Sequence, residues 1–302
     1  MDSWSIQKIW NEKLSLERTE GKVRNYISAS DIGKPFLDRY YKMKGVKPTN
    51  GYDERILRVF DAGNIFEWIV ERVFRLAGIL QDTQVKIGIP ENDKHLYIAG
   101  YIDCIVGGLP EWSIARDKIK ADQLPEWLEK RCLRLIDELE KDYPNGLEPI
   151  VAEIKSVNSM AFWAHKNQTP EGFFKGYDHH KLQLLTYLLG QPIKKGRLFY
   201  ISKDDLTLQE TGVFVTDELL KVWNDDIESM SKFYRTNTEP PREEDIVFNK
   251  SKDKYEKNWK VGRSSYLTKI TGLSKEDWEI KTHEKVLAKN KEYRKEKKKE
   301  AK

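Results

Sequence analysis

Cysteine is scarce in this sequence of 302 residues, which contains only Cys104 and Cys132. Two cysteines exclude a disulfide scaffold and any zinc or iron–sulfur site built from cysteine alone, so we expect two ordinary thiols. Long apolar runs are also missing, because no stretch reaches the ~18 apolar residues of a membrane span. The first residues lack a basic region followed by an apolar run. We therefore expect no secretion signal, no membrane partner and a cytoplasmic location.

The residues that are present suffice for a large folded core. Apolar residues make up 39% of the chain and aromatic residues 11%, which argues against disorder of the whole chain. The length corresponds to one large domain or two small ones. A chain of this length needs no disulfide or structural metal in order to fold.

Charge is distributed unevenly along the chain. Residues 281–302 contain ten Lys or Arg and four Asp or Glu, so this stretch carries +6. The remaining 280 residues carry −2 of the total charge of +4. Such a basic tail is either a solvated helix end or disordered arm, or an electrostatic arm for nucleic acid.

Hydrophobic periodicity predicts helices and strands that alternate through the centre of the sequence. The expected helices cover residues 1–20, 35–41, 53–80 with a break near Gly63, 178–190 and 216–234, and the expected strands cover 85–89, 96–106, 149–155, 196–202 and 206–215. The charged residues 110–146 are expected to form a helical insertion. This order is typical of an α/β or α+β core around one sheet, here with a helical N-terminal lobe.

Two carboxylate motifs lie on the expected central strands. Asp103 is a single carboxylate in an apolar strand, and because an unpaired buried carboxylate is costly, it needs a metal, a cation or hydrogen bonds. The alternative is a strand-end residue that caps a neighbour. On the next strand, Glu153 and Lys155 point to the same side while Ile154 points to the core. They form either a functional pair or a salt bridge on an edge strand.

Two helix motifs accompany these carboxylates. Gln183 and Tyr187 are four residues apart, so they share one helix face, either as functional groups or at the boundary with solvent. Gly63 costs about 1 kcal/mol relative to alanine inside a helix and indicates the close approach of another backbone. Glu67 follows one turn later. The alternative is a kinked helix with a surface glutamate.

The four motifs follow one another along the chain as Gly63-x-x-x-Glu67, Asp103, Glu153-x-Lys155 and Gln183-x-x-x-Tyr187. This order resembles the PD-(D/E)XK nuclease superfamily, in its RecB-like exonuclease branch. That branch includes the CRISPR spacer-acquisition nucleases and many phage recombination exonucleases. The resemblance covers about residues 26–215 and implies an α/β fold with a restriction-endonuclease-like core, in which helices flank a central mixed sheet.

The resemblance also implies a catalytic site and its metal. The implied catalytic residues are Asp103, Glu153, Lys155, Glu67, Gln183 and Tyr187. Asp103, Glu153, Glu67 and the Ile154 carbonyl would bind one or two Mg²⁺ or Mn²⁺ ions, which prefer hard oxygen ligands. Lys155 would position water or neutralise phosphate charge. Gln183 and Tyr187 would hold the substrate strand or orient Lys155.

A wider set of side chains is expected to contact nucleic acid: His180, Lys181, Lys203, Lys166 and Trp163. The lysines would line a groove for phosphates. Trp163 would stack on an unpaired base or close the core.

Two features depart from the family pattern. The insertion at 110–146 is either a surface elaboration or a contact for DNA or a partner. Many RecB-like relatives carry an iron–sulfur cluster, but Val261 and Ser264 stand where its C-x-x-C would fall, so no cluster is expected. The N- and C-terminal segments are still expected to pack together through apolar side chains such as Trp259 and Tyr266.

These inferences predict one nuclease domain over residues 1–280, with its core at about 60–235, a C-terminal helical segment at 236–280 and a basic tail at 281–302. The expected activity is metal-dependent hydrolysis of DNA, as an exonuclease at single- or double-stranded ends in recombination, repair or phage DNA metabolism. A recombinase or single-strand-annealing protein would be its partner in a bacterial or phage-infected cell. The alternatives are a structure-specific endonuclease, a nucleic-acid-binding subunit with a nuclease fold, and an unrelated α/β protein in which the motifs do not converge.

Overall fold

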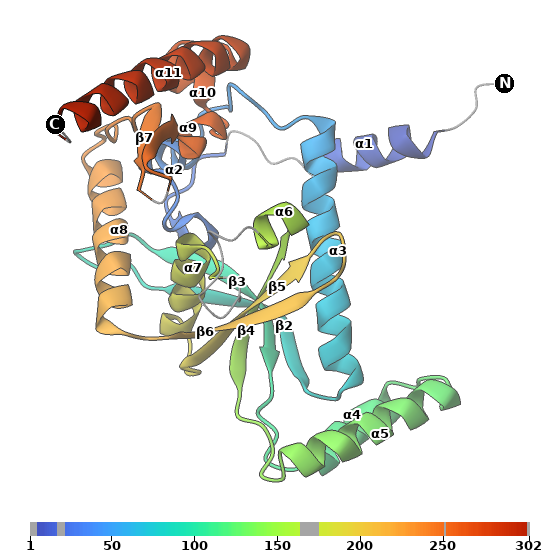
Figure 1. The fold of residues 1–302 in the computed structure, drawn as a ribbon. Helices are drawn as coiled ribbons and strands as arrows, with labels where there is room; N and C mark the ends of the chain where they lie inside the picture. The colour runs from blue at the N-terminus through green and yellow to red at the C-terminus, as the bar shows by residue number, and fades with distance from the viewer. Residues whose placement is uncertain (1–4, 17–21, 164–174, 251, 301–302) are drawn as a thin grey trace. The chain divides into compact units, whose positions relative to one another are not determined.

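A mixed sheet of six strands organises the computed structural model, which describes residues 5–16, 22–163, 175–250 and 252–300 (Figure 1). The chain divides into two units. The sheet unit comprises residues 26–33 and 59–228, and the terminal unit comprises residues 1–25, 34–58 and 229–302. The protein is thus a mixed α/β protein whose central sheet is flanked by helices, as the sequence predicts.

The sheet strands are β1 (Ile27–Ser28), β2 (Leu80–Ile89), β3 (Ile98–Val106), β4 (Ile150–Val157), β5 (Lys195–Ser202) and β6 (Leu208–Phe214). Their order is β1-β3-β4-β5-β6, with β2 also paired to β3. The β1–β3 and β4–β5 pairs are parallel and the others are antiparallel. Because β2 follows β3 along its whole length, β1 and β4 must share the other edge of β3. The sheet therefore forks along β3, with β1 at Ile98 and β4 from Cys104 onward.

Two helices cover opposite faces of the sheet. Val70 and Phe74 of α3 (Glu54–Leu76) pack on one face with strand residues such as Ile154. Leu184 and Leu188 of α7 (Asp178–Leu189) pack on the other. Successive strand side chains alternate between these two layers. α6 (Ser159–Phe162) and α8 (Asp217–Arg235) complete the helices that follow β4 and β6.

The expected break of α3 at Gly63 is wrong, because the helix runs without interruption. A Cβ at Gly63 would lie 3.7 Å from the Ser156 Oγ of β4, an ordinary van der Waals contact. The neighbour that the glycine indicated is thus a small side chain of the central strand. Because α3 is a continuous helix, Glu67 follows Gly63 by about one turn and lies near the same part of β4.

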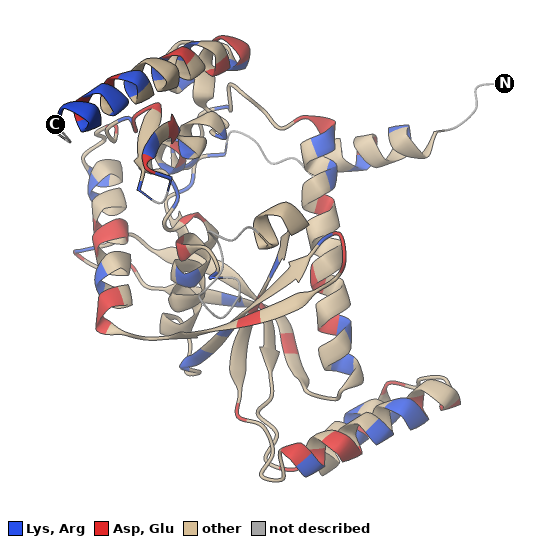
Figure 2. Cartoon of the chain, viewed as in Figure 1, with Lys and Arg blue, Asp and Glu red and all other residues tan. Residues whose placement is uncertain are grey.

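Residues 110–146 form two helices, α4 (Trp112–Ala121) and α5 (Glu126–Asp142), as expected. They enclose a separate apolar cluster around the fully buried Ile136. Acidic and basic residues are interspersed along both helices (Figure 2). Gly146 closes the insertion at φ +79°, where a Cβ would overlap the Leu109 carbonyl oxygen.

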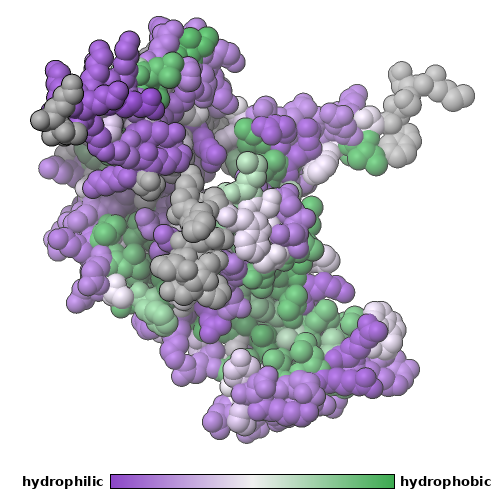
Figure 3. Space-filling model, viewed as in Figure 1, coloured by the Kyte–Doolittle hydropathy of each residue, from purple (hydrophilic) through white to green (hydrophobic). Residues whose placement is uncertain are grey.

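The terminal unit contains α1 (Ile6–Leu16), α2 (Phe36–Met43), β7 (Ile246–Asn249), β8 (Lys254–Lys257), α9 (Trp259–Gly262), α10 (Leu267–Thr271) and α11 (Lys275–Glu300). The expected helical segment at 236–280 is therefore partly wrong, because β7 and β8 form an antiparallel hairpin there. The basic tail continues α11 as regular helix through residue 300. Hydrophilic side chains cover most of the face of α11 seen in Figure 3.

N- and C-terminal segments pack together inside the terminal unit, as expected. Ser264 donates to Asp38 at 2.6 Å, and the Tyr266 and Tyr41 rings lie 5.3 Å apart. Trp259 does not contribute as expected, because 56% of it is exposed. In the part of the chain that the structure describes, no helix combines the length and apolar composition that crossing a membrane requires.

Candidate active site

The fork in the sheet positions Asp103. β3 and β4 pair from Val106 and Ile150 to Cys104 and Ala152, where their ladder ends. The next β3 residue is Asp103, whose Oδ2 accepts a hydrogen bond from the Ile154 backbone N–H at 2.8 Å. The carboxylate thus takes the place of a backbone acceptor and holds the two strands together as they separate.

Glu153 lies at the centre of the site and is fully buried. Its Oε1 accepts a hydrogen bond from Gln183 at 2.6 Å and pairs with the Lys155 ammonium. Gln183 also donates to the Tyr187 hydroxyl at 2.8 Å, so α7 contributes two groups four residues apart to one chain of hydrogen bonds. The structure brings these four predicted residues together.

The second carboxylate oxygen of Glu153, Oε2, is buried without a hydrogen-bond donor among the described residues. The Asp103 carboxyl is within interaction range of Glu153. Two ionised carboxylates are both acceptors, so neither can satisfy the other without a shared proton or a cation between them. A buried unsatisfied acceptor is uncommon in a folded protein and calls for an explanation.

Glu67 reaches the same site from α3. Its Oε1 accepts a hydrogen bond from Gln84 of β2 at 2.7 Å. Burial, together with the charge of Asp103, raises the pKa of Glu67 to about 7, while Lys155 opposes the rise. Gln84 has φ +50°, a left-handed conformation that is unusual for a residue other than glycine. Sequence reasoning missed Gln84, because no local pattern marks a strained residue in a strand.

Among the described residues, the site contains three carboxyl groups and one cation, Lys155. Burial raises the pKa values of Asp103 and Glu153, and Lys155 opposes both shifts. Burial disfavours the charged form of Lys155, but the charges of Glu153 and Asp103 outweigh it and raise its pKa. Lys155 therefore stays protonated, but its single charge does not balance three carboxyl groups, and their excess negative charge when ionised favours the binding of a further cation.

The donor set suits a hard divalent cation, because it consists of carboxylate oxygens. The unsatisfied Oε2 of Glu153 and the adjacent Asp103 carboxyl are the atoms that a cation would satisfy. Over the described ranges, no three His, Cys, Asp or Glu side chains already form a closed metal-binding group. The carboxyl groups of Asp103, Glu153 and Glu67 form a looser cluster.

His180 lies near this cluster with a partner that the sequence analysis overlooked. The His180 Nδ1 and the Tyr200 hydroxyl are 3.1 Å apart, and Tyr200 also accepts from the Tyr177 N–H at 3.1 Å. Tyr200 pairs with Lys155 across the β4–β5 ladder. Its signal in the sequence is hidden, because a tyrosine in an apolar strand resembles an ordinary core residue.

The other predicted nucleic-acid contacts are spread more widely. Lys181 lies 3.6 Å from Asp178 on its own helix. Lys203 follows β5, and burial lowers its pKa. Trp163 is 46% exposed and donates to Asp205 at 3.3 Å. Lys166 lies outside the described residues.

Comparison with known proteins adds little to this geometry. No family model matches the chain, and no curated protein matches it. The chain resembles a solved structure, the crystal structure of SSO0001, at 16% sequence identity and a TM-score of 0.49, over 89% of this chain and 96% of that one. The class that the fold defines is a mixed α/β protein with a central mixed sheet flanked by helices.

Proposed function

We propose that the sheet unit is a metal-dependent DNA nuclease of the PD-(D/E)XK type, and an exonuclease of its RecB-like branch. One observation carries the proposal. Asp103, from one strand, and the Glu153–Lys155 pair, from a strand about 50 residues further along the chain, converge around a buried carboxylate oxygen that has no donor among the described residues. In an unrelated α/β protein that contains these motifs by chance, the three side chains would not be expected to converge.

A divalent ion would be held by Asp103, Glu153, Glu67 and the Ile154 carbonyl. When bound, Mg²⁺ or Mn²⁺ supplies an activated water and stabilises the negative charge that develops on the phosphate. The residues of the chain prepare this site. Asp103 links the two strands through the Ile154 N–H, so the ligand oxygens stay in register.

A substrate phosphate can reach the Lys155 ammonium, because 25% of the Lys155 side chain is exposed. The Glu153 side chain beside it is fully buried. Its protonated ammonium can donate hydrogen bonds to a phosphate oxygen and offset the charge of that group. Gln183 acts as a positioning residue, because it donates to both Glu153 and Tyr187 and so limits the rotation of the carboxylate. Lys155 and Gln183 are thus already placed for these roles in the folded chain.

Cleavage of end-labelled linear DNA and closed circular DNA tests this proposal, with Mg²⁺, Mn²⁺ or EDTA present. We expect metal-dependent loss of linear DNA by the wild-type chain and no cleavage by Glu153→Ala, Asp103→Ala or Lys155→Ala. Glu210→Ala is the matched control, because it removes an exposed carboxylate of the same sheet that pairs with Arg197. It should cleave like the wild type.

The outcomes separate the alternatives. Cleavage of closed circles would make the protein an endonuclease at the same site. Full activity of a folded Glu153→Ala chain would remove the assigned residues from the reaction. Absence of cleavage by the wild type with every metal and DNA form would refute the nuclease proposal for the isolated chain.

A further inference from the structure

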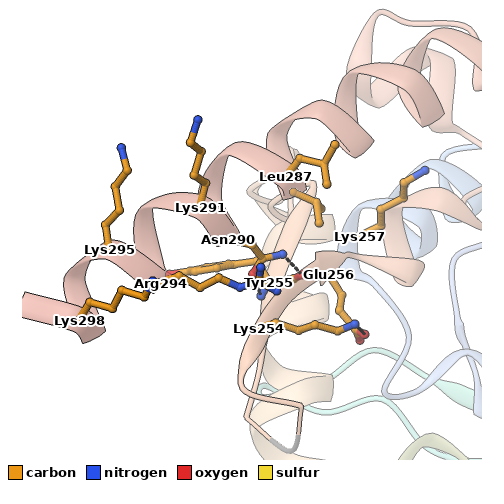
Figure 4. A pocket seen from close by; sticks show the side chains of 11 residues that line it. Lys254, Tyr255, Glu256, Lys257, Leu287, Asn290, Lys291, Arg294, Lys295 and Lys298 are labelled. Atoms are coloured by element: carbon orange, nitrogen blue, oxygen red, sulfur yellow. Dashed lines mark hydrogen bonds and ion pairs between the residues drawn. The ribbon is translucent and has the colours of Figure 1, made fainter. Parts of the chain in front are cut away.

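A groove of about 620 Å³ lies between β8 and the C-terminal half of α11, within the terminal unit (Figure 4). Asn290 of α11 fixes its walls, because the side chain accepts from the Tyr255 N–H at 2.7 Å and donates to the Tyr255 carbonyl at 2.9 Å. The rings of Phe248 and Tyr293 pack against Tyr255, with centroids 5.1 Å and 6.2 Å away. The helix and the hairpin therefore hold the groove in one shape.

The lining of this groove is strongly basic. Its six cations are Lys254, Lys257, Lys291, Arg294, Lys295 and Lys298. Glu256 is the single carboxylate among the described lining residues, so the groove carries +5, more than the +4 of the whole chain. Basic residues crowd the end of α11 in Figure 2. The excess of positive over negative charge in the chain is thus concentrated at this groove.

The cations of the groove differ in their partners. Lys254 lies 3.7 Å from Glu256, and Lys257 pairs with Glu279. The four groove cations that α11 contributes, Lys291, Arg294, Lys295 and Lys298, have no ion pair or hydrogen bond through their charged groups in the part of the chain that the structure describes. Each of these four cations is three or four residues from two of the others along the helix, so their like charges repel one another. A bound polyanion would offset this repulsion and stabilise the helix end.

The spacing of these four cations suits a chain of phosphates. From Lys291 to Lys298 the helix rises about 10 Å, a length over which one strand of a duplex carries about three phosphates. Lys291 and Lys295 extend from α11 side by side in Figure 4. Arg294 adds a planar guanidinium that can bind two oxygens of one phosphate.

A membrane surface fits this helix less well than nucleic acid. A helix that lies on a membrane needs a broad apolar face opposite its basic face. Ile280 and Leu287 are the large apolar residues of α11 that are well exposed among those described, and they are two turns apart. They do not form a continuous apolar face.

We propose that the groove between β8 and α11 binds the sugar–phosphate backbone of nucleic acid, outside the carboxylate site. As a surface that holds the substrate of a nuclease, it rests on the function proposed above. The binding itself does not, because the groove contains neither the carboxylate cluster nor the proposed metal ligands. The two proposals can therefore fail separately.

The test measures the binding of a short fluorescent duplex in EDTA at several salt concentrations. The variant carries Lys291→Gln, Arg294→Gln, Lys295→Gln and Lys298→Gln. The matched control replaces four exposed cations of α4 and α5 by glutamine: Lys120, Lys130, Arg134 and Lys141. Both variants lose the same charge. An unchanged circular dichroism spectrum and unfolding temperature verify that each is folded.

We expect the groove variant to bind the duplex at least about tenfold more weakly than the wild type at low salt. The slope of the logarithm of the binding constant against the logarithm of the salt concentration should become shallower by about 2.7, or about 0.9 for each of three phosphate contacts. The control should keep the wild-type slope. Equal binding by the groove variant and the wild type, or equal loss in both variants, would overturn the proposal. So would wild-type binding to vesicles of anionic lipid but not to DNA. A groove variant that loses binding, while the wild type never cleaves, would support this groove and refute the nuclease.

Discussion

Addition of Mn²⁺ to the purified chain should act on three carboxyl groups whose neighbouring ammonium, among the described residues, is that of Lys155. Burial raises the pKa values of Glu67, Asp103 and Glu153. Near neutral pH their ionised forms therefore lower the free energy of unfolding, because the unfolded state binds fewer protons than the folded state. A divalent cation that satisfies Glu153 Oε2 removes part of this cost and binds the folded chain alone.

The size of the effect follows from linkage. Metal at 100 times its dissociation constant adds about 2.7 kcal/mol to the free energy of unfolding. A unit of 150–250 residues gains about 2–4 °C in unfolding temperature for each kcal/mol. The expected rise is therefore about 5–10 °C at that ratio of metal to dissociation constant.

Thermal unfolding in EDTA and in increasing Mn²⁺ or Mg²⁺ measures this rise without any substrate. Glu153→Gln keeps the shape of the side chain but removes its charge, so we expect it to lose most of the metal-induced rise. Glu210→Gln, which removes an exposed carboxylate, should keep it. No rise for the wild type at saturating metal, or the full rise for Glu153→Gln, would contradict the proposed metal site.

Other substitutions test the site and the fold. Because the folded pKa of Glu67 is about 7 against an ordinary 4.5, its stabilising contribution is complete below pH 4.5 and is lost as the pH rises through 7; Glu67→Gln should flatten this part of the pH dependence of the urea midpoint in EDTA, and an unchanged profile would contradict the assignment. Gly100→Ala places a Cβ 2.8 Å from the Tyr187 ring, so urea unfolding should show a loss of about 1–3 kcal/mol, whereas wild-type stability would show that the contact relaxes freely. Ile136→Ala empties the core between α4 and α5 and should cost about 2–5 kcal/mol, seen as faster hydrogen exchange of α5 amides; unchanged exchange would place this residue outside the cooperative core.

Features that depend on short-range periodicity could be predicted from the amino-acid sequence alone. Alternation along a strand put Glu153 and Lys155 on one side and Ile154 in the opposite apolar layer, where the structure has it. The four-residue spacing of a helix put Gln183 and Tyr187 within one hydrogen bond of each other. These relations involve neighbours within about one helical turn or two strand residues, so each is legible without knowledge of the fold.

Which distant segments meet depends on the tertiary fold and could not be predicted from local sequence patterns. The division of one β3 edge between β1 and β4 brings Asp103 to the Ile154 N–H, 51 residues away. The reach of Gln84 to Glu67 depends on a strained backbone angle that no propensity predicts. The hairpin of β7 and β8 escaped prediction because each strand has only four residues, β8 is mostly charged, and α11 supplies part of its packing. Strand pairing and the clustering of the carboxyl groups of Glu67, Asp103 and Glu153 both join segments that are far apart in the sequence. Their free energy depends on the whole fold, so a local sequence pattern does not predict them.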